Sequence, residues 1–234
     1  MKILVACEES QAVTIELRKL GHEAYSCDII ECSGGHTEWH IKQDVLDILN
    51  PGMQLKGLSR EYYGIKPFQT MDGAYHFITG KWDMIIAHPP CTYLTGAGAC
   101  NIPKHPERIQ LGFEAAAFFM KILRADCEKV VVENPPPMKR FNIPKYTQIV
   151  RPWMFGDRNN KPICLWIKGV EKLRPTNVTE KDQDIVKWVH KATGKQKSCS
   201  RWYNTHTNDH SRHRSKTFPG IAKAMAEQWA GSAT

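Results

Sequence analysis

The stretch KILVACEESQAVTIELRKLGHEAYSCDII, residues 2–30, decides the fold. Its first five residues, Lys2–Ala6, are apolar and rich in branched side chains, which predicts a buried strand. Apolar residues then recur at helical spacing over residues 13–20, before Gly21, a residue type that commonly ends a helix. Residues 23–30 predict a second strand. A strand, a helix and a strand in this order form a βαβ unit, whose two strands are parallel.

The same alternation continues along the chain. Short apolar runs at residues 82–87, 129–133 and 163–167 predict further buried strands, and residues 106–125 predict an amphipathic helix. We therefore expect a doubly wound, largely parallel α/β sheet. Ligands of such sheets bind beyond the carboxyl ends of the strands, so residues that directly follow a strand are the candidates for function.

Size, charge and cysteine content narrow the class of protein. The 234 residues suit one large domain, or one domain with a small attachment. A net charge of +8 favours an acidic partner such as nucleic acid. The eight cysteines include no C-x-x-C pair, and several lie in apolar runs, which indicates a reducing cytosol. Because no apolar stretch reaches 18 residues, we expect a cytoplasmic protein that does not span a membrane.

Two regions depart from the alternation. Residues 50–81 contain five glycines and two prolines, and they are interpreted as an insertion, either a lid or a plain surface excursion. Residues 187–216 contain eight Lys or Arg, four His and a single acid, with aromatic residues between them. This pattern predicts a phosphate-binding stretch with stacking groups, or else a solvated basic loop. The candidate nucleic-acid contacts are Arg201, Trp202, Arg212, Arg214 and Lys216.

Two residues at predicted strand ends are candidates for catalysis. Cys91 follows Pro89 and Pro90, so a stiff backbone would hold its thiol at the carboxyl edge of the sheet, as a nucleophile requires. Glu133 ends a run of three valines and precedes Asn134. Burial at this position would raise the pKa of the Glu133 carboxyl group and make it a proton donor near neutral pH.

The segments AHPPCTYLT around Cys91 and VVVENPPP around Glu133 resemble the DNA cytosine-C5 methyltransferases. That family has a Pro-Pro-Cys loop and a Glu-Asn pair in the same order, on a class I, Rossmann-like sheet that binds S-adenosylmethionine. The resemblance implies that Cys91 adds to C6 of a cytosine and that Glu133 holds and protonates N3. The activated C5 would then take the methyl group.

The resemblance extends to the cofactor side. Asp28 matches the acid that binds the ribose hydroxyls, and Asp44, after a predicted third strand, matches the acid that reads the adenine amino group. The family's Phe-x-Gly-x-Gly turn is replaced here by a Cys-Glu-Glu-Ser run, in which Glu8 or Ser10 would contact the methionine end of the cofactor. Pro89 is also placed on the cofactor side.

The later part of the chain matches in weaker ways. FGDRNNKPICLWIKG resembles a segment with a Gln-x-Arg-x-Arg pattern, in which Asn159 and Lys161 match the first two polar positions and Ile163 replaces the last arginine. Lys161 is therefore assigned to the catalytic group, while Arg158 or Arg151 would replace the lost contact. The resemblance implies a catalytic core over residues 1–168, a small basic target-recognition region over 169–214, and a terminal helix over 215–234 that returns to the core.

These assignments imply a partner, a location and alternatives. The substrate would be double- or single-stranded DNA, and the protein would be a monomer or weak dimer in the cytoplasm of a bacterial or phage-infected cell. An amino-group DNA methyltransferase is one alternative, although the tetrapeptide at residues 88–91 does not suit it. An inactive nucleic-acid-binding relative is another, favoured by the glycine-free loop. A zinc site is a third alternative. The spacing of its four ligand-type residues matches no common zinc finger, so no metal is assigned. Its ligands would be Cys199, His206, His210 and His213.

Overall fold

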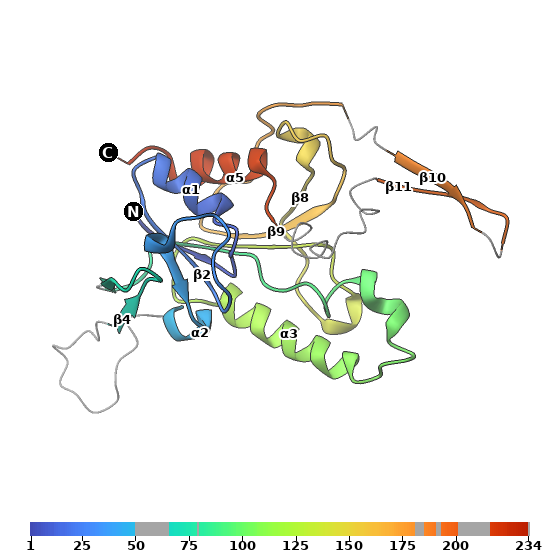
Figure 1. The fold of residues 1–234 in the computed structure, drawn as a ribbon, viewed down its shortest axis with the longest axis horizontal. Coiled ribbons are helices and arrows are strands. Elements are labelled where there is room, and N and C mark those ends of the chain that lie inside the picture. The colour runs from blue at the N-terminus through green and yellow to red at the C-terminus, as the bar shows by residue number, and fades with distance from the viewer. Residues whose placement is uncertain (50–65, 79, 181–184, 191–192, 201–215, 234) are drawn as a thin grey trace.

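A computed structural model describes residues 1–233 except 50–65, 79, 181–184, 191–192 and 201–215. Its centre is one seven-stranded sheet with the strand order β3-β2-β1-β6-β7-β9-β8 (Figure 1). The strands are β1 (Lys2–Ala6), β2 (Glu23–Asp28), β3 (His40–Lys42), β6 (Met84–Ala87), β7 (Val130–Asn134), β8 (Gln148–Val150) and β9 (Ile163–Lys168).

The direction of the strands confirms the expected fold class. β3, β2, β1, β6 and β7 are parallel to one another, and β9 is antiparallel to both β7 and β8. The spatial order of these strands follows the doubly wound pattern of a Rossmann-like sheet. The antiparallel strand β9, although the last of these strands in the chain, is inserted between β7 and β8. The fold is therefore a doubly wound, largely parallel α/β sheet.

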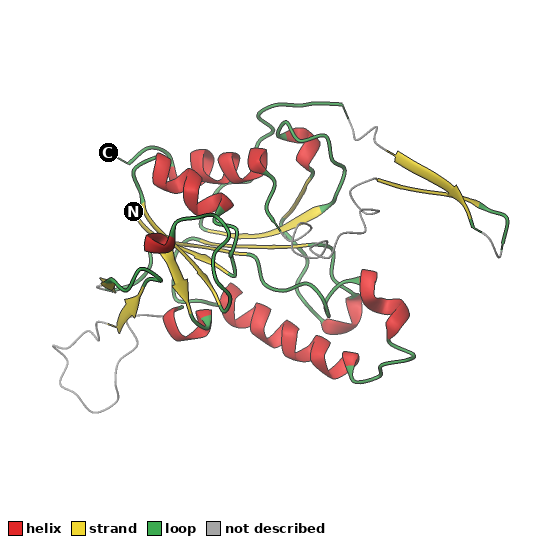
Figure 2. Cartoon of the chain, viewed as in Figure 1, coloured by secondary structure: helices red, strands yellow, loops and turns green. Residues whose placement is uncertain are grey.

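Helices cover both faces of the sheet (Figure 2). Helix α1 (Ala12–Lys19) lies on one face beside α5 (Pro219–Met225), which continues into the π-helical turn η6 (Ala226–Ala230). The other face carries α2 (Val45–Ile48) and the long α3 (Arg108–Leu123). The 3-10 turns are η1 (Thr37–Trp39), η2 (Gly96–Asn101), η3 (Lys139–Phe141) and η4 (Pro152–Met154).

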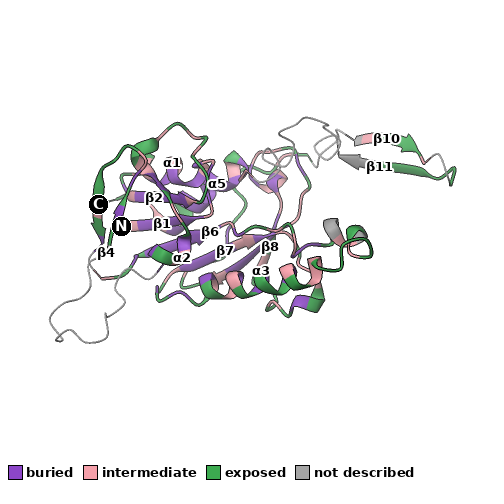
Figure 3. Ribbon diagram, turned by 60° about the horizontal axis from the view of Figure 1, so that its bottom comes forward, coloured by how far each residue is buried: buried purple, intermediate pink, exposed green. Residues whose placement is uncertain are grey.

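The central strand β1 shows why the strands of the sheet have continuous apolar sequences. Leu4 and Ala6 belong to the core on the α3 face, whereas Ile3 and Val5 belong to the core on the α1 and α5 face. All four side chains are fully buried, as Figure 3 shows for the middle of the sheet. A strand buried on both faces needs an apolar residue at every position, not at every second one.

A first hairpin occupies the described part of the segment interpreted as an insertion. Strands β4 (Lys66–Gln69) and β5 (Tyr75–Ile78) are antiparallel. Phe68 packs edge-on against Tyr25 near the start of β2, with ring centroids 5.0 Å apart. Met71 N donates to the carbonyl of His40, the first residue of β3, over 2.8 Å. The hairpin therefore lies toward the amino ends of the strands, opposite the edge where a lid would be needed.

A second hairpin overlaps the first part of the basic segment, residues 187–216. Strands β10 (Ile185–Val189) and β11 (Gln196–Ser200) are antiparallel and project away from the sheet and its helices (Figure 1). Within the described residues, no helix is long and apolar enough to cross a membrane.

Candidate active site

The candidate site lies where β1, β6 and β7 end at the same edge of the sheet. β1 and β6 are neighbours although the chain forms β2 and β3 between them, so the strand order reverses direction here. Such a reversal is where doubly wound sheets bind their ligands. The loop after β1 begins at Cys7, the loop after β6 at His88, and β7 ends with Glu133 and Asn134.

Glu133 is paired with a residue that the sequence did not single out for function. Its Oε2 lies 3.2 Å from Nδ1 of His88, and the two side chains are only 14% and 7% exposed. His88 is fixed by its own backbone, since its N–H donates to the carbonyl of Ala6 over 2.9 Å. Neighbouring parallel strands β6 and β7 thus bring an imidazole and a carboxylate into contact.

The charges at this pair correct one expectation from the sequence. Burial alone would raise the pKa of Glu133, but the hydrogen bond and charge of His88, with the charge of Lys161, hold that pKa below its ordinary value. Burial opposes the charged form of His88, yet Glu133 and then Glu8 raise the pKa of His88 above its ordinary value. The expectation that burial makes Glu133 a proton donor is therefore wrong. The contact instead favours the protonated form of His88 and the ionised form of Glu133.

The Pro-Pro-Cys loop is attached to the end of β7. Asn134 Nδ2 donates to the carbonyl of Pro89 over 2.8 Å, and the Asn134 side chain is buried. The carbonyl of Cys91 accepts from the N–H groups of Leu94 and Thr95 over 3.1 and 3.2 Å, which closes a tight turn around the partly buried cysteine. Cys91 is therefore held at the same edge as Glu133 by backbone contacts of its own loop.

The loop after β1 makes a glycine-like turn without glycine. Cys7 and Gln11 have φ of 57° and 58°, in the left-handed region that glycine adopts most readily. Glu8, between them, is 3% exposed. Its carboxylate accepts from Val13 N over 2.6 Å, and from Thr14 Oγ1 over 2.7 Å and Thr14 N over 3.3 Å. Glu8 therefore caps α1. Its expected contact with the cofactor did not include this role.

The two acids assigned to the cofactor lie beside each other at the ends of β2 and β3. Burial raises the pKa of the Cys7 thiol well above its ordinary value, and the carboxylates of Asp28 and Asp44 raise it further. Asp28 is partly buried, and its Oδ1 accepts from Ile30 N over 3.3 Å. Asp44 is exposed, and its Oδ1 caps α2 by accepting from Leu46 N over 2.9 Å. The partly buried Ser10 belongs to the neighbouring turn.

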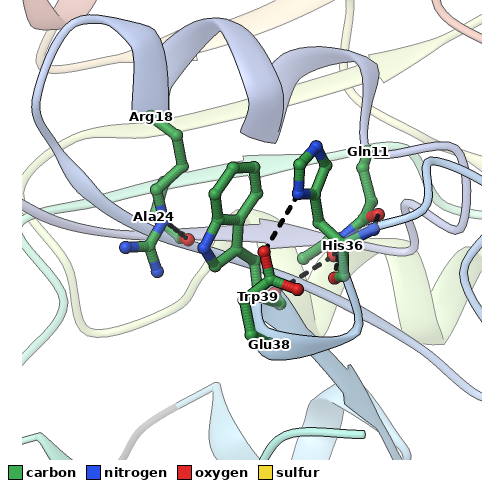
Figure 4. A network of polar contacts seen from close by, with 7 residues as sticks. Gln11, Arg18, Ala24, His36, Glu38 and Trp39 are labelled. Carbon is green, nitrogen blue, oxygen red and sulfur yellow. Dashed lines mark hydrogen bonds and ion pairs between the residues drawn. The ribbon is translucent and has the colours of Figure 1, made fainter. Parts of the chain in front are cut away.

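Gln11 fastens the connection between β2 and β3 to this turn. Its Oε1 accepts from His36 N over 3.0 Å, and its Nε2 donates to the His36 carbonyl over 2.8 Å. Figure 4 shows the cluster around His36. The His36 ring stacks on the Trp39 ring with centroids 3.8 Å apart, and Glu38 Oε1 is hydrogen-bonded to His36 Nδ1. The Arg18 guanidinium lies 5.2 Å from the centre of the Trp39 ring, and Arg18 Nε donates to the carbonyl of Ala24. These contacts hold the connection in place against α1 and the turn that precedes it.

The segment before β9 brings a cation toward the pair. Lys161 N donates to the buried Asn159 Oδ1 over 2.9 Å, and the positive charge of Lys161 lowers the pKa of Glu133. Arg151 instead donates from Nη1 to the carbonyl of Asn160 over 2.6 Å, while Arg158 is exposed. Lys161, which matches the second polar position of the pattern, therefore acts on Glu133 through its charge.

The expected nucleic-acid contacts fall largely outside the described residues. Arg201, Trp202, Arg212 and Arg214 are among those not described, and so are the three histidines of the zinc idea; Lys216 is described and partly buried. The described β10–β11 hairpin carries exposed Lys187, Lys195 and Lys197. Trp188, opposite Lys197 in the register, is 40% exposed. Within the described residues, no cluster of three or more His, Cys, Asp or Glu could hold a metal ion.

The sequence missed two side chains at the site. His88 was visible as the first residue of the His-Pro-Pro-Cys tetrapeptide, directly after a buried strand, and this position was the available signal. Thr217, whose Oγ1 lies 3.4 Å from His88 Nδ1, precedes α5 by two residues and had no sequence signal, because its contact depends on how the terminal helix returns to the sheet.

Comparison with known proteins gives likenesses among solved structures but no family. No protein-family model matches the chain, and no curated protein matches it. Among solved structures, a match is an E. coli protein encoded within a prophage and provisionally described as a DNA modification methyltransferase. The TM-score is 0.41 at 14% identity, and the match covers 76% of this chain. This chain corresponds to about half of that structure, 51% of its length.

Proposed function

We propose that the protein is an S-adenosylmethionine-dependent DNA cytosine-C5 methyltransferase with Cys91 as its nucleophile. The observation that carries the proposal is the joining of the Pro-Pro-Cys loop to the Glu133-Asn134 strand end. Asn134 binds the Pro89 carbonyl, and Glu133 binds His88, the first residue of the same tetrapeptide. A thiol and an acid–base pair held on adjacent strand ends are the groups that addition to C6 and proton transfer at N3 require.

The acids at the ends of β2 and β3 fit the cofactor. Carboxylates accept hydrogen bonds from hydroxyl and amino groups, so Asp28 suits a ribose diol and Asp44 suits an adenine amino group. The left-handed turn at Cys7 and Gln11 supplies the backbone shape that glycines supply in the resembling family. Ser10 and Pro89 are assigned to the same side, whereas Glu8 is assigned to capping α1. Bound S-adenosylmethionine would supply an electrophilic methyl group.

The residues of the chain then perform the activation of the base. The thiolate of Cys91 forms a bond to C6, the C5=C6 π pair moves to the C4=C5 bond, and the C4=N3 pair takes a proton at N3. Without that proton the ring would carry a full negative charge, which a buried site stabilises poorly. After C5 has been methylated, water takes the C5 proton. The S–C6 bond then breaks, restoring the C5=C6 bond, and N3 returns its proton to the Glu133 side.

The β10–β11 hairpin is the described element best suited to contact DNA. Its exposed lysines can neutralise phosphates, and Trp188 can stack on a base. Arg201, Trp202, Arg212, Arg214 and Lys216 are proposed to extend this surface. A duplex substrate also requires the cytosine to leave the stack, at a cost of a few kcal/mol that phosphate contacts offset. The proposal includes a cytoplasmic monomer or weak dimer.

Nucleoside mass spectrometry tests the reaction. Mixed-sequence duplex and single-stranded DNA are incubated with S-adenosylmethionine and either wild-type protein or Cys91→Ala. We expect 5-methylcytosine with wild type alone, on at least one of the two DNA forms. A methylated amino group would assign the chain to the amino-group class instead. DNA and cofactor binding without any modified base would identify an inactive nucleic-acid-binding protein.

A further inference from the structure

The His88 side chain is a buried polar group at the site, and the proposed reaction does not specify its part in the acid–base pair with Glu133. His88 is not among the residues that the resemblance assigns to catalysis or to the cofactor. Only 7% of its side-chain surface is exposed. An imidazole inside a protein must gain contacts that offset its desolvation. Its surroundings therefore indicate what it does.

The polar contacts of His88 are concentrated on one ring nitrogen. Nδ1 lies 3.2 Å from Glu133 Oε2 and 3.4 Å from Thr217 Oγ1. Nε2 is buried and has no hydrogen-bond partner among the described residues. The ring is therefore oriented by its contact with Glu133, from β7, and by the backbone bond to Ala6, from β1.

The charges around His88 favour a proton on the pair. Glu133 faces it from β7 and Glu8 from the loop after β1, and both stabilise an imidazolium. Lys161, from the segment before β9, disfavours the imidazolium and stabilises the Glu133 carboxylate. Two carboxylates against one ammonium leave the balance on the side of the imidazolium.

We propose that His88 is a positioning residue for Glu133, which holds the carboxylate by Nδ1 and stores the proton that Glu133 passes to N3 of the target base. This inference rests on the proposed function. It adds to that function a proton store on the first residue of the Pro-Pro-Cys tetrapeptide.

The proton balance of this step is simple. Before reaction the pair is an imidazolium and a carboxylate that together hold one transferable proton. As Cys91 bonds to C6, the Nδ1 proton moves to Glu133 and Glu133 delivers a proton to N3, leaving a neutral imidazole beside a carboxylate. When Cys91 leaves C6, the N3 proton returns to the pair. No further proton donor is consumed.

A matched set of variants separates this role from a structural one. His88→Asn keeps an amide nitrogen near the place of Nδ1, so it can still donate to Glu133, but it cannot store a proton. Glu133→Gln removes the charge from the other side. His105→Asn is the control, because His105 Nδ1 lies at the same 3.2 Å from Glu107 Oε1 but in a pair that is 60% and 62% exposed.

Histidine NMR measures the pair without turnover. In protein labelled with ¹⁵N-histidine, the signals that His88→Asn removes identify the His88 ring. We expect the pKa of His88 to lie above its ordinary 6.5 in the wild type. In Glu133→Gln, burial still disfavours the charged form of His88, but the neutral amide no longer offsets that effect as the carboxylate does. We therefore expect the pKa of His88 to fall below 6.5. A pKa of 6.5 or lower in the wild type, unmoved by Glu133→Gln, would overturn the proposal.

Release of tritium from C5-labelled cytosine in DNA measures proton delivery itself. Addition of Cys91 and protonation at N3 make C5 exchange its hydrogen with water, so the readout needs no methyl transfer. We expect the wild-type rate to decline only above pH 6.5, as His88 loses its proton. In His88→Asn, we expect at least a ~10-fold slower rate at about pH 7.5 and a decline that begins at lower pH. Wild-type rate and pH profile in His88→Asn would overturn the role.

The two readouts distinguish the failure of this inference from that of the proposed function. No exchange and no 5-methylcytosine with wild type, beside a His88 that titrates as expected, would refute the proposed reaction while leaving the pair in place. Exchange that is active in the wild type and equally active in His88→Asn would refute the role of His88 alone. His105→Asn should match the wild type in both assays.

Discussion

Removing the carboxylate of Glu8 should destabilise the protein as a whole. Glu8→Ala deletes the acceptor for Val13 N, Thr14 N and Thr14 Oγ1, at a residue that is 3% exposed. The Thr14 hydroxyl can turn to another partner, but the two backbone N–H groups stay in the first turn of α1. At about 1–3 kcal/mol for each buried donor left unpaired, we expect a loss of about 3 kcal/mol in the free energy of unfolding.

Urea unfolding and thermal melts measure this loss. For a chain of this length, about 3 kcal/mol corresponds to a Tm lowered by roughly 6–12 °C. Glu8→Gln keeps one acceptor oxygen and should lose about 1 kcal/mol. Glu16→Gln, on the same helix and in an ion pair with Lys19, should change stability by less than about 0.5 kcal/mol. Unchanged stability in Glu8→Ala, with S-adenosylmethionine bound at least tenfold more weakly, would refute the capping role and restore Glu8 to the cofactor.

Three further predictions concern turnover, DNA binding and pH. Glu133→Gln should slow the formation of 5-methylcytosine by about 10²-fold or more in a steady-state assay, and full activity would show that Glu133 does not transfer the proton. Replacing Lys187 and Lys197 by Gln should make the negative slope of log K for DNA binding against log salt concentration shallower by about 2 in titrations. An unchanged slope would place the DNA elsewhere. The His88–Glu133 pair should stabilise the fold most between pH 4.5 and 6.5. Above that window His88, whose pKa is raised, loses its proton, and below it the carboxylate, whose pKa is lowered, gains one. The urea midpoint at about pH 5.5 should therefore exceed the midpoints at acid and alkaline pH by more in wild type than in His88→Asn, and equal differences would contradict the pairing.

The strands and helices of the sheet were the most predictable part of the molecule. β1 occupies the predicted residues 2–6, and α3 runs from Arg108 to Leu123 within the predicted 106–125. These elements are buried on one or both sides, so their apolar periodicity is strong. Strand β9 was expected from its apolar run, but its antiparallel direction depends on the path of the chain between β7 and β9, which periodicity does not encode.

The hairpins were harder to predict because their stability depends on distant contacts. In β4 and β5 the buried residues Phe68 and Ile78 face the core beside Trp82, yet they stand among exposed neighbours in a glycine-rich segment. A pattern of this kind resembles a surface loop until the sheet that it packs against is known. In β10 and β11 the lysines hide the alternation of the strands.

At the site, sequence placed the residues but misjudged their chemistry. The positions of Cys91, Glu133 and Asp28 at the carboxyl ends of buried strands follow from the topology of a parallel sheet. The pKa of Glu133 could not be predicted in this way, because its direction depends on which neighbour faces the carboxylate. The structure places His88 there, directly after the adjacent strand β6, and the contact reverses the effect of burial.

The central claim is a covalent bond between Cys91 and C6 of a DNA cytosine, and trapping measures it directly. DNA containing 5-fluorocytosine is incubated with the protein and S-adenosylmethionine, because fluorine at C5 cannot leave as a proton does and the adduct persists. We predict a protein–DNA adduct that survives denaturation and whose mass-mapped peptide carries the base on Cys91, with none formed by Cys91→Ala. Methylation of ordinary cytosine without an adduct on fluorinated DNA, or an adduct on another cysteine, would contradict the account.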